Sequence, residues 1–408
     1  MRDQRQSSRE LWTISTGHAL THWYPASFFL LLPLIGKEFG LTYSQIGFIV
    51  FVDSITTAAA NVPAGMLVDT VGQRRLLMAL ALFGVGLPYL ILSVAHSYWL
   101  ILACVTLTGI SNNLWHPTAI PALAELYPGR KGLVLSLHGM AANLGDALAP
   151  VAVGAVLAIV SWREVVVINV VPGILAAAAI LYFLRHLSDS PSPGPAGARP
   201  APDAGPYLER VKGLLRNRGL VLITLSSGLR SMTQKTLITF LPVYLAYELG
   251  YSPLWVGVGM FALQAAGFVA APIAGYTSDR VGRQETSAAS MAITALILVT
   301  MALVGKSPLF IALVAGLGFF LFALRPIMQA WMLEVTPEGT AGTSVGLLFG
   351  VQSLGNAVAP LVGGLVADRY GLTATFYFVA FTIFVGNLLV LAMPKSRSTP
   401  AATSAAAG

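Results

Sequence analysis

Charged and imidazole side chains occur inside the long apolar stretches of this 408-residue chain. Holding a charge at the centre of a bilayer costs about 2.5–3.5 kcal/mol on an insertion scale, so such residues are rarely retained without a role. Carboxylates there can carry protons, arginine and lysine can hold anions, and imidazoles titrate near neutral pH. The candidates are Asp53, Asp146, Arg230, Lys235, Arg325, His18, His22 and His116.

Several of these side chains belong to polar pairs that are spaced four residues apart. In a helix this spacing places both members on the same face. Because the pairs interrupt four different apolar stretches, the pattern predicts four helices that line one water-filled cavity. The pairs are His18/His22, Asn112/His116, Arg230/Gln234 and Arg325/Gln329.

The residue types predict two roles for these candidates. Cationic side chains indicate a substrate with anionic or phosphate-like oxygens, to which arginine presents a planar fork. A desolvated carboxylate or an imidazole can bind and release a proton. We therefore expect substrate contacts from His22, His116, Arg230, Lys235, Arg325 and Gln329, and proton coupling by Asp53, Asp146 or His18.

Purely structural roles are open alternatives for the same residues. Both aspartates would equally serve as ion-pair partners of the cationic side chains, which would leave a polar but nearly uncharged cavity. The histidines would equally form hydrogen bonds between helices. A metal centre is not expected, because the histidines are spread over separate stretches and Cys104 is the only cysteine.

Twelve apolar stretches of membrane-spanning length must position these side chains. Only 10% of the residues are charged, the mean hydropathy is +0.74, and about 20 apolar residues suffice to cross the hydrocarbon layer. The first stretch lacks a small-residue cleavage site, so we expect a retained span and not a signal peptide. The spans are predicted at 11–36, 44–68, 76–95, 98–124, 132–160, 164–185, 218–247, 252–277, 288–305, 308–335, 342–367 and 372–393.

The second half of the chain repeats the first at an offset of about 210 residues. Gly65 and Asp69 recur as Gly275 and Asp279, and the segment 145–150 recurs as 355–360. Parallel six-helix repeats place a substrate site near the bilayer midplane between the halves. We predict an all-α membrane protein with an N-terminal six-helix half (1–185), a Pro/Gly/Ser-rich cytoplasmic linker (186–217), a pseudo-symmetric C-terminal half (218–393) and a disordered tail (394–408).

The basic residues are distributed unevenly around the predicted spans. With both termini in the cytoplasm, only Lys37, Arg163, Lys306 and Arg369 lie on the outer side, and most other lysines and arginines lie on the cytoplasmic side. This asymmetry is the positive-inside pattern. It accounts for the net charge of +7 without nucleic acid as a partner. We expect a multi-pass protein of a bacterial inner membrane with both termini in the cytoplasm.

The segments that follow the second span of each half resemble the signature loop of the major facilitator superfamily. The resemblance covers residues 11–393 and implies a transporter that alternates access by rocking its two halves around a central site. Thr70 and Gln73 occupy positions that are usually basic in the family, so the first loop is a weakened copy. The matching residues are Gly65, Asp69, Gly72, Arg74 and Arg75, and then Gly275, Asp279, Arg280, Gly282 and Arg283.

These loops are expected to gate the cytoplasmic side. Gly65 would let its helix approach a neighbour closely. The positive N-terminal end of the span 342–367 would attract Asp69 and hold that side shut. Simple turn chemistry is the alternative. The gating candidates are Gly65, Asp69, Arg74, Gly275, Asp279, Arg280 and Arg283.

Within the superfamily, the chain resembles the fosmidomycin-resistance exporters. The matches include His18, Pro33, the run 38–47, His116-Pro117, Gly129-Arg130, Gly132-Leu133, Ser136, Asn143, Gly145 and Pro150. His22 replaces an aspartate of that group, Thr118 stands where the group tends to have glutamate, and Asp146 replaces a small residue. The coupling carboxylate is therefore expected to have moved to the span 132–160. The resemblance does not carry the antibiotic substrate across.

The span 342–367 has a pattern of glycines and proline that resembles one found in antiporters of the superfamily. Close helix packing explains this pattern equally well. The residues are Gly346, Gly355, Ala359-Pro360 and Gly363-Gly364.

We expect a proton-coupled efflux transporter of a small amphiphilic or anionic compound. Proton-linked uptake of an organic anion is the alternative, and a non-transporting membrane sensor a remote one. The expected partners are a small-molecule substrate, protons and lipid. We expect no cofactor besides the proton gradient, no enzymatic activity and a monomer.

Overall fold

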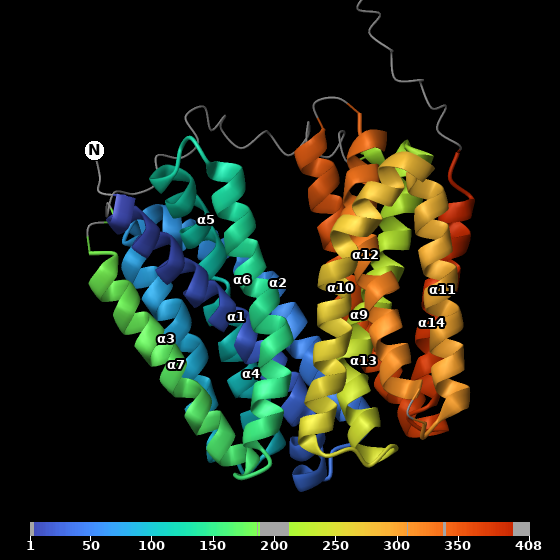
Figure 1. Ribbon diagram of the computed structural model, residues 1–408, viewed down its shortest axis with the longest axis horizontal. Coiled ribbons are helices and arrows are strands. Elements are labelled where there is room, and N and C mark those ends of the chain that lie inside the picture. The colour runs from blue at the N-terminus through green and yellow to red at the C-terminus, as the bar shows by residue number, and fades with distance from the viewer. Residues whose placement is uncertain (1–3, 186, 188–211, 308, 338–339, 395–408) are drawn as a thin grey trace, which may run out of the picture.

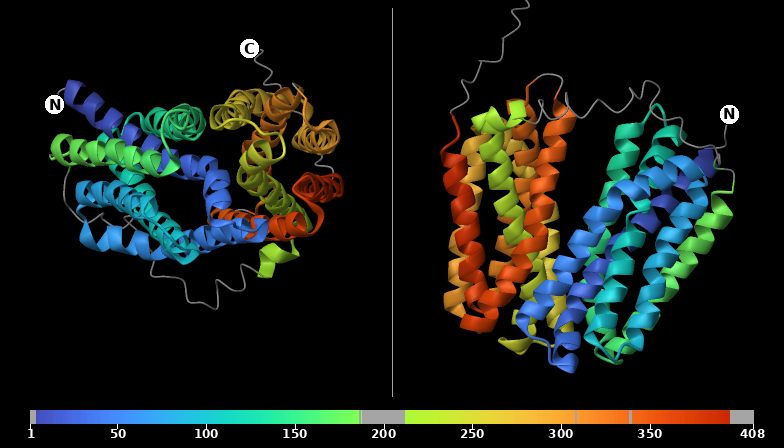
Figure 2. Two further views of the ribbon diagram at one scale, coloured as in Figure 1. Left: turned by 90° about the horizontal axis from the view of Figure 1, so that it is seen from below. Right: turned by 180° about the vertical axis from the view of Figure 1, so that it is seen from behind.

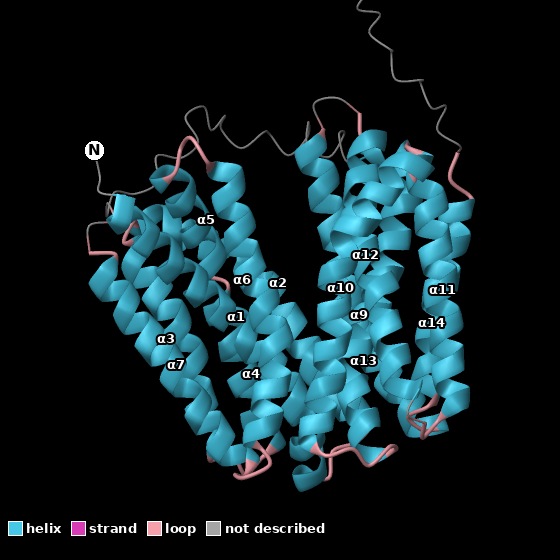
Figure 3. Ribbon diagram, viewed as in Figure 1, coloured by secondary structure: helices cyan, strands magenta, loops and turns pink. Residues whose placement is uncertain are grey.

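A computed structural model describes residues 4–185, 187, 212–307, 309–337 and 340–394 (Figure 1). The described part of the chain is helical and contains no strand (Figure 3). Residues 212–216 of the predicted linker are helical, and most of that linker and the tail 395–408 lie outside the described residues. The helices are α1 (Gln4–Phe39), α2 (Tyr43–Val71), α3 (Arg74–Ser93), α4 (Tyr98–Asn112), α5 (Trp115–Leu126), α6 (Lys131–Val156), α7 (Trp162–Phe183), α9 (Arg218–Tyr247), α10 (Pro253–Val281), α11 (Arg283–Val304), α12 (Leu309–Val335), α13 (Ala341–Tyr370) and α14 (Ala374–Leu391).

These helices are consistent with twelve membrane spans. Among the described residues, nine helices are long and apolar enough to cross a bilayer, and ten if the bent α2 counts as one span. α9 has 30 residues and carries Arg230, Gln234 and Lys235 in its middle, which lowers its hydropathy. α4 and α5 are short and together cover the remaining predicted span, 98–124.

The prediction of one continuous helix over 98–124 is wrong, because the chain turns between Asn112 and Trp115. Pro117 lies two residues after the start of α5 and has no N–H to donate to the Asn113 carbonyl, so a helix cannot run through this point undisturbed. The Asn113 side chain instead donates hydrogen bonds to the carbonyls of Thr57 and Gly109 at 2.9 and 3.1 Å. Asn112 and His116 therefore do not share one face of a single helix.

The helices form two bundles, α1–α7 and α9–α14, as the repeat in the sequence predicts (Figures 1 and 2). α1 begins, α7 ends, α9 begins and α14 ends at the same end of the molecule (Figure 1). Large apolar side chains are exposed on the helices, such as Phe83 on α3 at 50% and Phe381 on α14 at 64%. Lipid tails would cover these surfaces in a membrane.

At the end opposite the termini, the two bundles touch through four glycines, and we call this end the sealed end. Gly47 of α2 leaves no room for a Cβ against the carbonyl of Pro360 in α13, and Gly364 packs in the same way on Tyr43. The same contacts recur 210 residues away, with Gly257 on Pro150 and Gly154 on Pro253. The repeat therefore builds the sealed end twice, once from α2 and α13 and once from α6 and α10.

At the opposite end, which we call the open end, the bundles diverge (Figures 1 and 2). A Cβ at Gly65, Gly275 or Gly346 would meet nothing within 4 Å. The expected close approach at Gly65 is therefore not made in this conformation. Since the same helices touch at their other ends, the molecule has the form of a V with its mouth on the side of the termini.

Capping residues set where the helices begin at the sealed end. Thr42 accepts a hydrogen bond from the backbone N–H of Gln45, and the Gln45 side chain accepts one from the Thr42 N–H, which together form a capping box at the start of α2. Ser161 and Glu164 form the same arrangement at the start of α7. These local interactions set the residues at which α2 and α7 begin.

Candidate functional site

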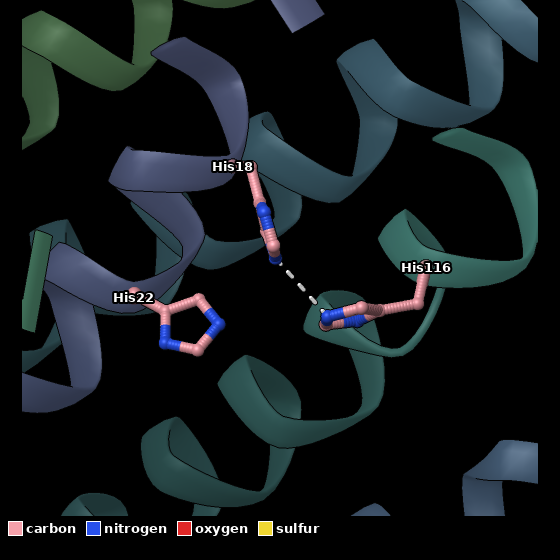
Figure 4. Close-up of side chains that lie close together, drawn as sticks. All are labelled: His18, His22 and His116. Atoms are coloured by element: carbon pink, nitrogen blue, oxygen red, sulfur yellow. Dashed lines mark hydrogen bonds between the residues drawn. The ribbon is translucent and has the colours of Figure 1, made fainter. Parts of the chain in front are cut away.

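Three histidines that the sequence spreads over two spans meet inside the first bundle (Figure 4). His18 and His22 lie one turn apart on α1, and His116 lies on α5. Nε2 of His18 is 3.2 Å from Nε2 of His116, and one nitrogen of each ring lies within 4.8 Å of the others. The sequence predicts scattered histidines, and the structure corrects this by bringing them together.

A hydrogen bond joins His22 to Asp146, which lies on α6. Nδ1 of His22 is 3.0 Å from Oδ2 of Asp146, and the two side chains are 32% and 29% exposed. Gly145 makes this approach possible, because a Cβ there would overlap the carbonyl of Ala19 on α1. Of the ion pairs considered for Asp146 from the sequence, none is formed within the described residues, and His22 takes that place.

A cavity of about 460 Å³ separates the two bundles near the middle of the helices. Asp146 of α6 faces it from the first bundle, and Lys235 of α9 and Arg325 and Gln329 of α12 face it from the second. Apolar side chains such as Phe29 complete the wall. The structure thus brings together four of the predicted site residues from both halves.

A second cavity of about 230 Å³ adjoins the first and shares Gln234, Lys235 and Arg325 with it. Arg230 lies at its wall and is only 2% exposed. The guanidinium donates to Oε1 of Gln234 at 2.5 Å and to Oγ of Ser231 at 2.9 Å. The i, i+4 partner predicted for Arg230 therefore holds this side chain in place.

Positive charge exceeds negative charge in these cavities. Arg230, Lys235 and Arg325 form no ion pair with any carboxylate of the described residues, and Asp146 is the one carboxylate among the residues described as lining the two cavities. Nζ of Lys235 lies 4.7 Å from the ring centroid of Phe29, a cation–π contact that crosses from α9 to α1. The described residues that line the two cavities therefore carry an excess of positive charge.

The chain matches the family model described as Major Facilitator Superfamily over residues 14–265 and 223–408. The chain belongs to this superfamily. It is 24% identical over 404 residues to the fosmidomycin resistance protein of Escherichia coli strain K12, covering 96% of this chain and 94% of that protein. It is 25% identical over 404 residues to a probable 4-methylmuconolactone transporter of Cupriavidus pinatubonensis, covering 96% and 91%.

A solved structure of a bacterial homologue of the human lysosomal transporter Spinster, in an inward-facing and occupied conformation, has the same fold. Its TM-score is 0.79 at 14% identity, over 96% of this chain and 97% of that chain. The expected fold class and the resemblance to the fosmidomycin-resistance branch are confirmed. The protein is a multi-pass membrane transporter and not an enzyme.

The remaining predicted residues of the transporter's site lie outside the two cavities. Asp53 of α2 borders a small apolar pocket inside the first bundle, together with Phe28 and Cys104. Neither His22 nor His116 is among the described residues that line the large cavity. His22 is hydrogen-bonded to Asp146, which does line it. The assignment of His116 as a substrate contact therefore has no direct support from its position.

The two loops that are predicted to gate the transporter differ between the halves. Arg283 pairs with Asp279 at 2.6 Å and with Glu334 at 3.1 Å. In the first half Gln73 stands at the position of Arg283, and Asp69 is exposed with no partner among the described residues. The expected contact between Asp69 and the start of α13 is not formed, consistent with the divergence of the open end.

In the first half, Arg74 forms an ion pair with Glu125 on α5, much as Arg283 does with Glu334 in the second half. The two guanidinium nitrogens of Arg74 donate to the two Glu125 oxygens at 2.5 and 2.7 Å. Glu125 follows the predicted span 98–124, and the guanidinium beside it lowers the pKa of that carboxyl below its usual range. Arg280, the remaining gating candidate, stacks over the ring of Tyr276 at 4.3 Å.

One contact residue of the sealed end, Asp368, is not predicted from the sequence. Both carboxylate oxygens of Asp368, at the end of α13, accept hydrogen bonds from the backbone of α2, at 2.7 Å from the Tyr43 N–H and 3.0 Å from the Ser44 N–H. Asp368 therefore caps a helix of the opposite half. The one sequence signal was an acidic residue near the end of a span, which does not identify a partner.

Proposed function

We propose that this transporter carries a small anionic or amphiphilic compound, held between the halves by Lys235, Arg325 and Gln329. The supporting observation is the imbalance of charge in the central cavity, where unpaired cations face one carboxylate that is engaged by a histidine. Lys235 is partly buried and Arg325 is exposed to the cavity, and a bound anion would supply the charge that both cations lack. The volume of about 460 Å³ falls within the range of roughly 300–1,000 Å³ for small-molecule sites.

Arg230 would extend this site into the adjoining cavity. Its guanidinium is oriented by Gln234 and Ser231, and its Nε has no hydrogen-bond partner among the described residues. A fixed guanidinium loses less conformational entropy on binding than a mobile one. An anion with two separated acidic groups would therefore engage Lys235 and Arg325 with one group and Arg230 with the other.

For the direction of transport, we propose efflux in exchange for protons. If both termini are cytoplasmic, the V opens to the cytoplasm and accepts substrate from that side. Rocking about the sealed end would then expose the cavity to the outside. The similarity to a fosmidomycin resistance protein supports this direction.

Proton-linked uptake is the second candidate, and the position of Asp53 favours it. Asp53 is within electrostatic range of Lys235. A proton on Asp53 would remove a negative charge near Lys235 and so strengthen the binding of an anion. Proton and anion would then bind together and move in the same direction.

Proteoliposomes with an imposed pH gradient and a pH-sensitive dye inside test both proposals. The probes are fosmidomycin, 4-methylmuconolactone, a panel of organic acids and phosphonates, and a panel of cationic drugs. Efflux by exchange predicts that anion and proton flow in opposite directions, and uptake predicts that they flow together. Movement of cationic drugs with no movement of any anionic probe would contradict an anion site.

A further inference from the structure

The three histidines of the first bundle lie outside the proposed substrate cavity. We propose that His18, His22 and His116 form a binding site for a divalent transition-metal ion such as Zn²⁺, Co²⁺ or Ni²⁺. The three ring nitrogens offered to the ion lie within 4.8 Å of one another and come from α1 and α5. This site is independent of the substrate and direction proposed above.

Hydrogen bonds on the far side of two rings determine which nitrogen is free. Nδ1 of His18 is 2.8 Å from the backbone carbonyl of His138, which can only accept, so this nitrogen carries the hydrogen. Nδ1 of His22 donates in the same way to the carboxylate of Asp146. In both rings Nε2 is then left with a lone pair. Metal-bound histidines almost always have such a carbonyl or carboxylate partner on the other nitrogen.

These nitrogens face a common point, at which Nε2 of His116 donates a hydrogen bond to Nε2 of His18 that a bound ion would replace (Figure 4). Nε2 of His18 points toward His116, and the ring nitrogen of His22 that is not bound to Asp146 faces the same side. In a tetrahedral zinc site with Zn–N bonds of about 2.0–2.1 Å, the ligand nitrogens are separated by roughly 3.3 Å. The spacing of 3.2 Å between His18 and His116 already matches this value. His22, whose ring nitrogen lies within 4.8 Å of the other two, must move inward to reach this spacing.

The surroundings hold the cluster in this arrangement. The ring of His138 stacks on that of His18 with centroids 3.9 Å apart and planes inclined by 14°. Gly17 and Gly145 allow α1 to approach Trp115 and α6 without an intervening side chain. The ligands therefore lie on packed helices and not on mobile loops, which favours metal binding because little order must be gained.

The chemistry and exposure of the ligands indicate which ions fit. Three neutral imidazoles suit zinc, cobalt, nickel and copper, whereas magnesium and calcium prefer oxygen ligands. Exposure rises from buried His18 through partly exposed His22 to exposed His116, so water can enter from the side of His116 and complete the coordination. The negative charge of Asp146 beside His22 would offset part of the charge of the ion.

Titration of the full-length, tag-free transporter with Co²⁺ in detergent or nanodiscs tests the site. We expect one Co²⁺ per chain, with the visible absorption of a nitrogen-ligated ion, and displacement by Zn²⁺ but not by Mg²⁺. His116→Ala should weaken binding at least about tenfold, and Asp146→Asn should weaken it by about 10- to 100-fold through the loss of the outer hydrogen bond. His96→Ala, which removes an exposed histidine outside the cluster, should bind as the wild type does.

A variant that adds an absorption band distinguishes a lost metal site from an unfolded protein. His116→Cys places a thiolate at the exposed ligand position and should add a thiolate-to-cobalt charge-transfer band in the near ultraviolet. His96→Cys should not add this band. Absence of Co²⁺ binding by the wild type, unchanged binding by His116→Ala, or no new band in a Co²⁺-loaded His116→Cys protein would each overturn the proposal and leave hydrogen bonding between helices as the role of the cluster.

Discussion

Charge in the central cavity is divided between residues of the two halves. Lys235 and Arg325 come from the second bundle, and Asp146 comes from the first. Hydropathy identifies such residues in the sequence because each one interrupts an apolar stretch. Their partners are not identifiable in that way, since Asp146 pairs with His22 and not with any cation. The residue types thus predict the character of the site, and helix packing decides which charges stay unpaired.

Replacing Lys235 tests the role of unpaired positive charge. Lys235→Gln should lower the apparent affinity for a transported anion by roughly 10- to 100-fold, because a hydrogen bond to a charged group contributes about 1.5–3 kcal/mol. Uptake of the anionic probe into proteoliposomes measures this change. Lys306→Gln, which removes an exposed lysine outside the cavities, is the control. Equal affinity in the two variants would exclude Lys235 from the binding site.

Among the helices, α2 has opposite environments at its two ends. Gly47 packs against the backbone of α13 at the sealed end, whereas Gly65 faces open space at the other end. The sequence repeat relates Gly47 to Gly257 and Pro150 to Pro360, but it does not show that each glycine contacts the proline of the other half. The pairing depends on how helices from the two halves cross, and the sequence of one helix does not specify this crossing.

A methyl group added at each end of α2 should have different effects. Gly47→Ala forces a Cβ against the Pro360 carbonyl, and overpacking of this kind costs about 1–3 kcal/mol. We expect a lower melting temperature in detergent for Gly47→Ala and no decrease for Gly65→Ala on the same helix. Equal melting temperatures for the two variants would mean that the close contact at the sealed end does not hold the halves together.

On the scale of the whole molecule, the sealed end determines which side of the membrane the cavity faces. Its contacts are short backbone approaches on both sides of the pseudo-symmetry axis. Asp368 adds a hydrogen-bonded cap from α13 to α2, and the related position in the first half is Ala158. Opening this end would therefore break one charged contact that has no equivalent at the related position of the first half.

Removing this cap should shift the balance between the two states. A carboxylate at a helix N-terminus contributes about 1–2 kcal/mol, so Asp368→Ala should raise the population open at the sealed end by roughly 5- to 30-fold. Distances between spin labels at Ser97→Cys and Lys306→Cys, on loops at that end of the two bundles, report the change. Arg369→Ala provides the neighbouring control. An unchanged distance distribution in Asp368→Ala would contradict a latch at this position.

Two six-helix halves, a membrane environment and the positions of the ionisable groups along the helices are predictable from the order of residues alone. These features follow from hydropathy along about 20 residues and from a repeat, both of which are properties of the chain read in order. The convergence of three histidines, the hydrogen bond between Asp146 and His22 and the closure of one end of the molecule follow from the packing of the helices. Those contacts join residues 98 to 325 positions apart, and they depend on the rotation and crossing of helices that glycine-to-backbone packing sets.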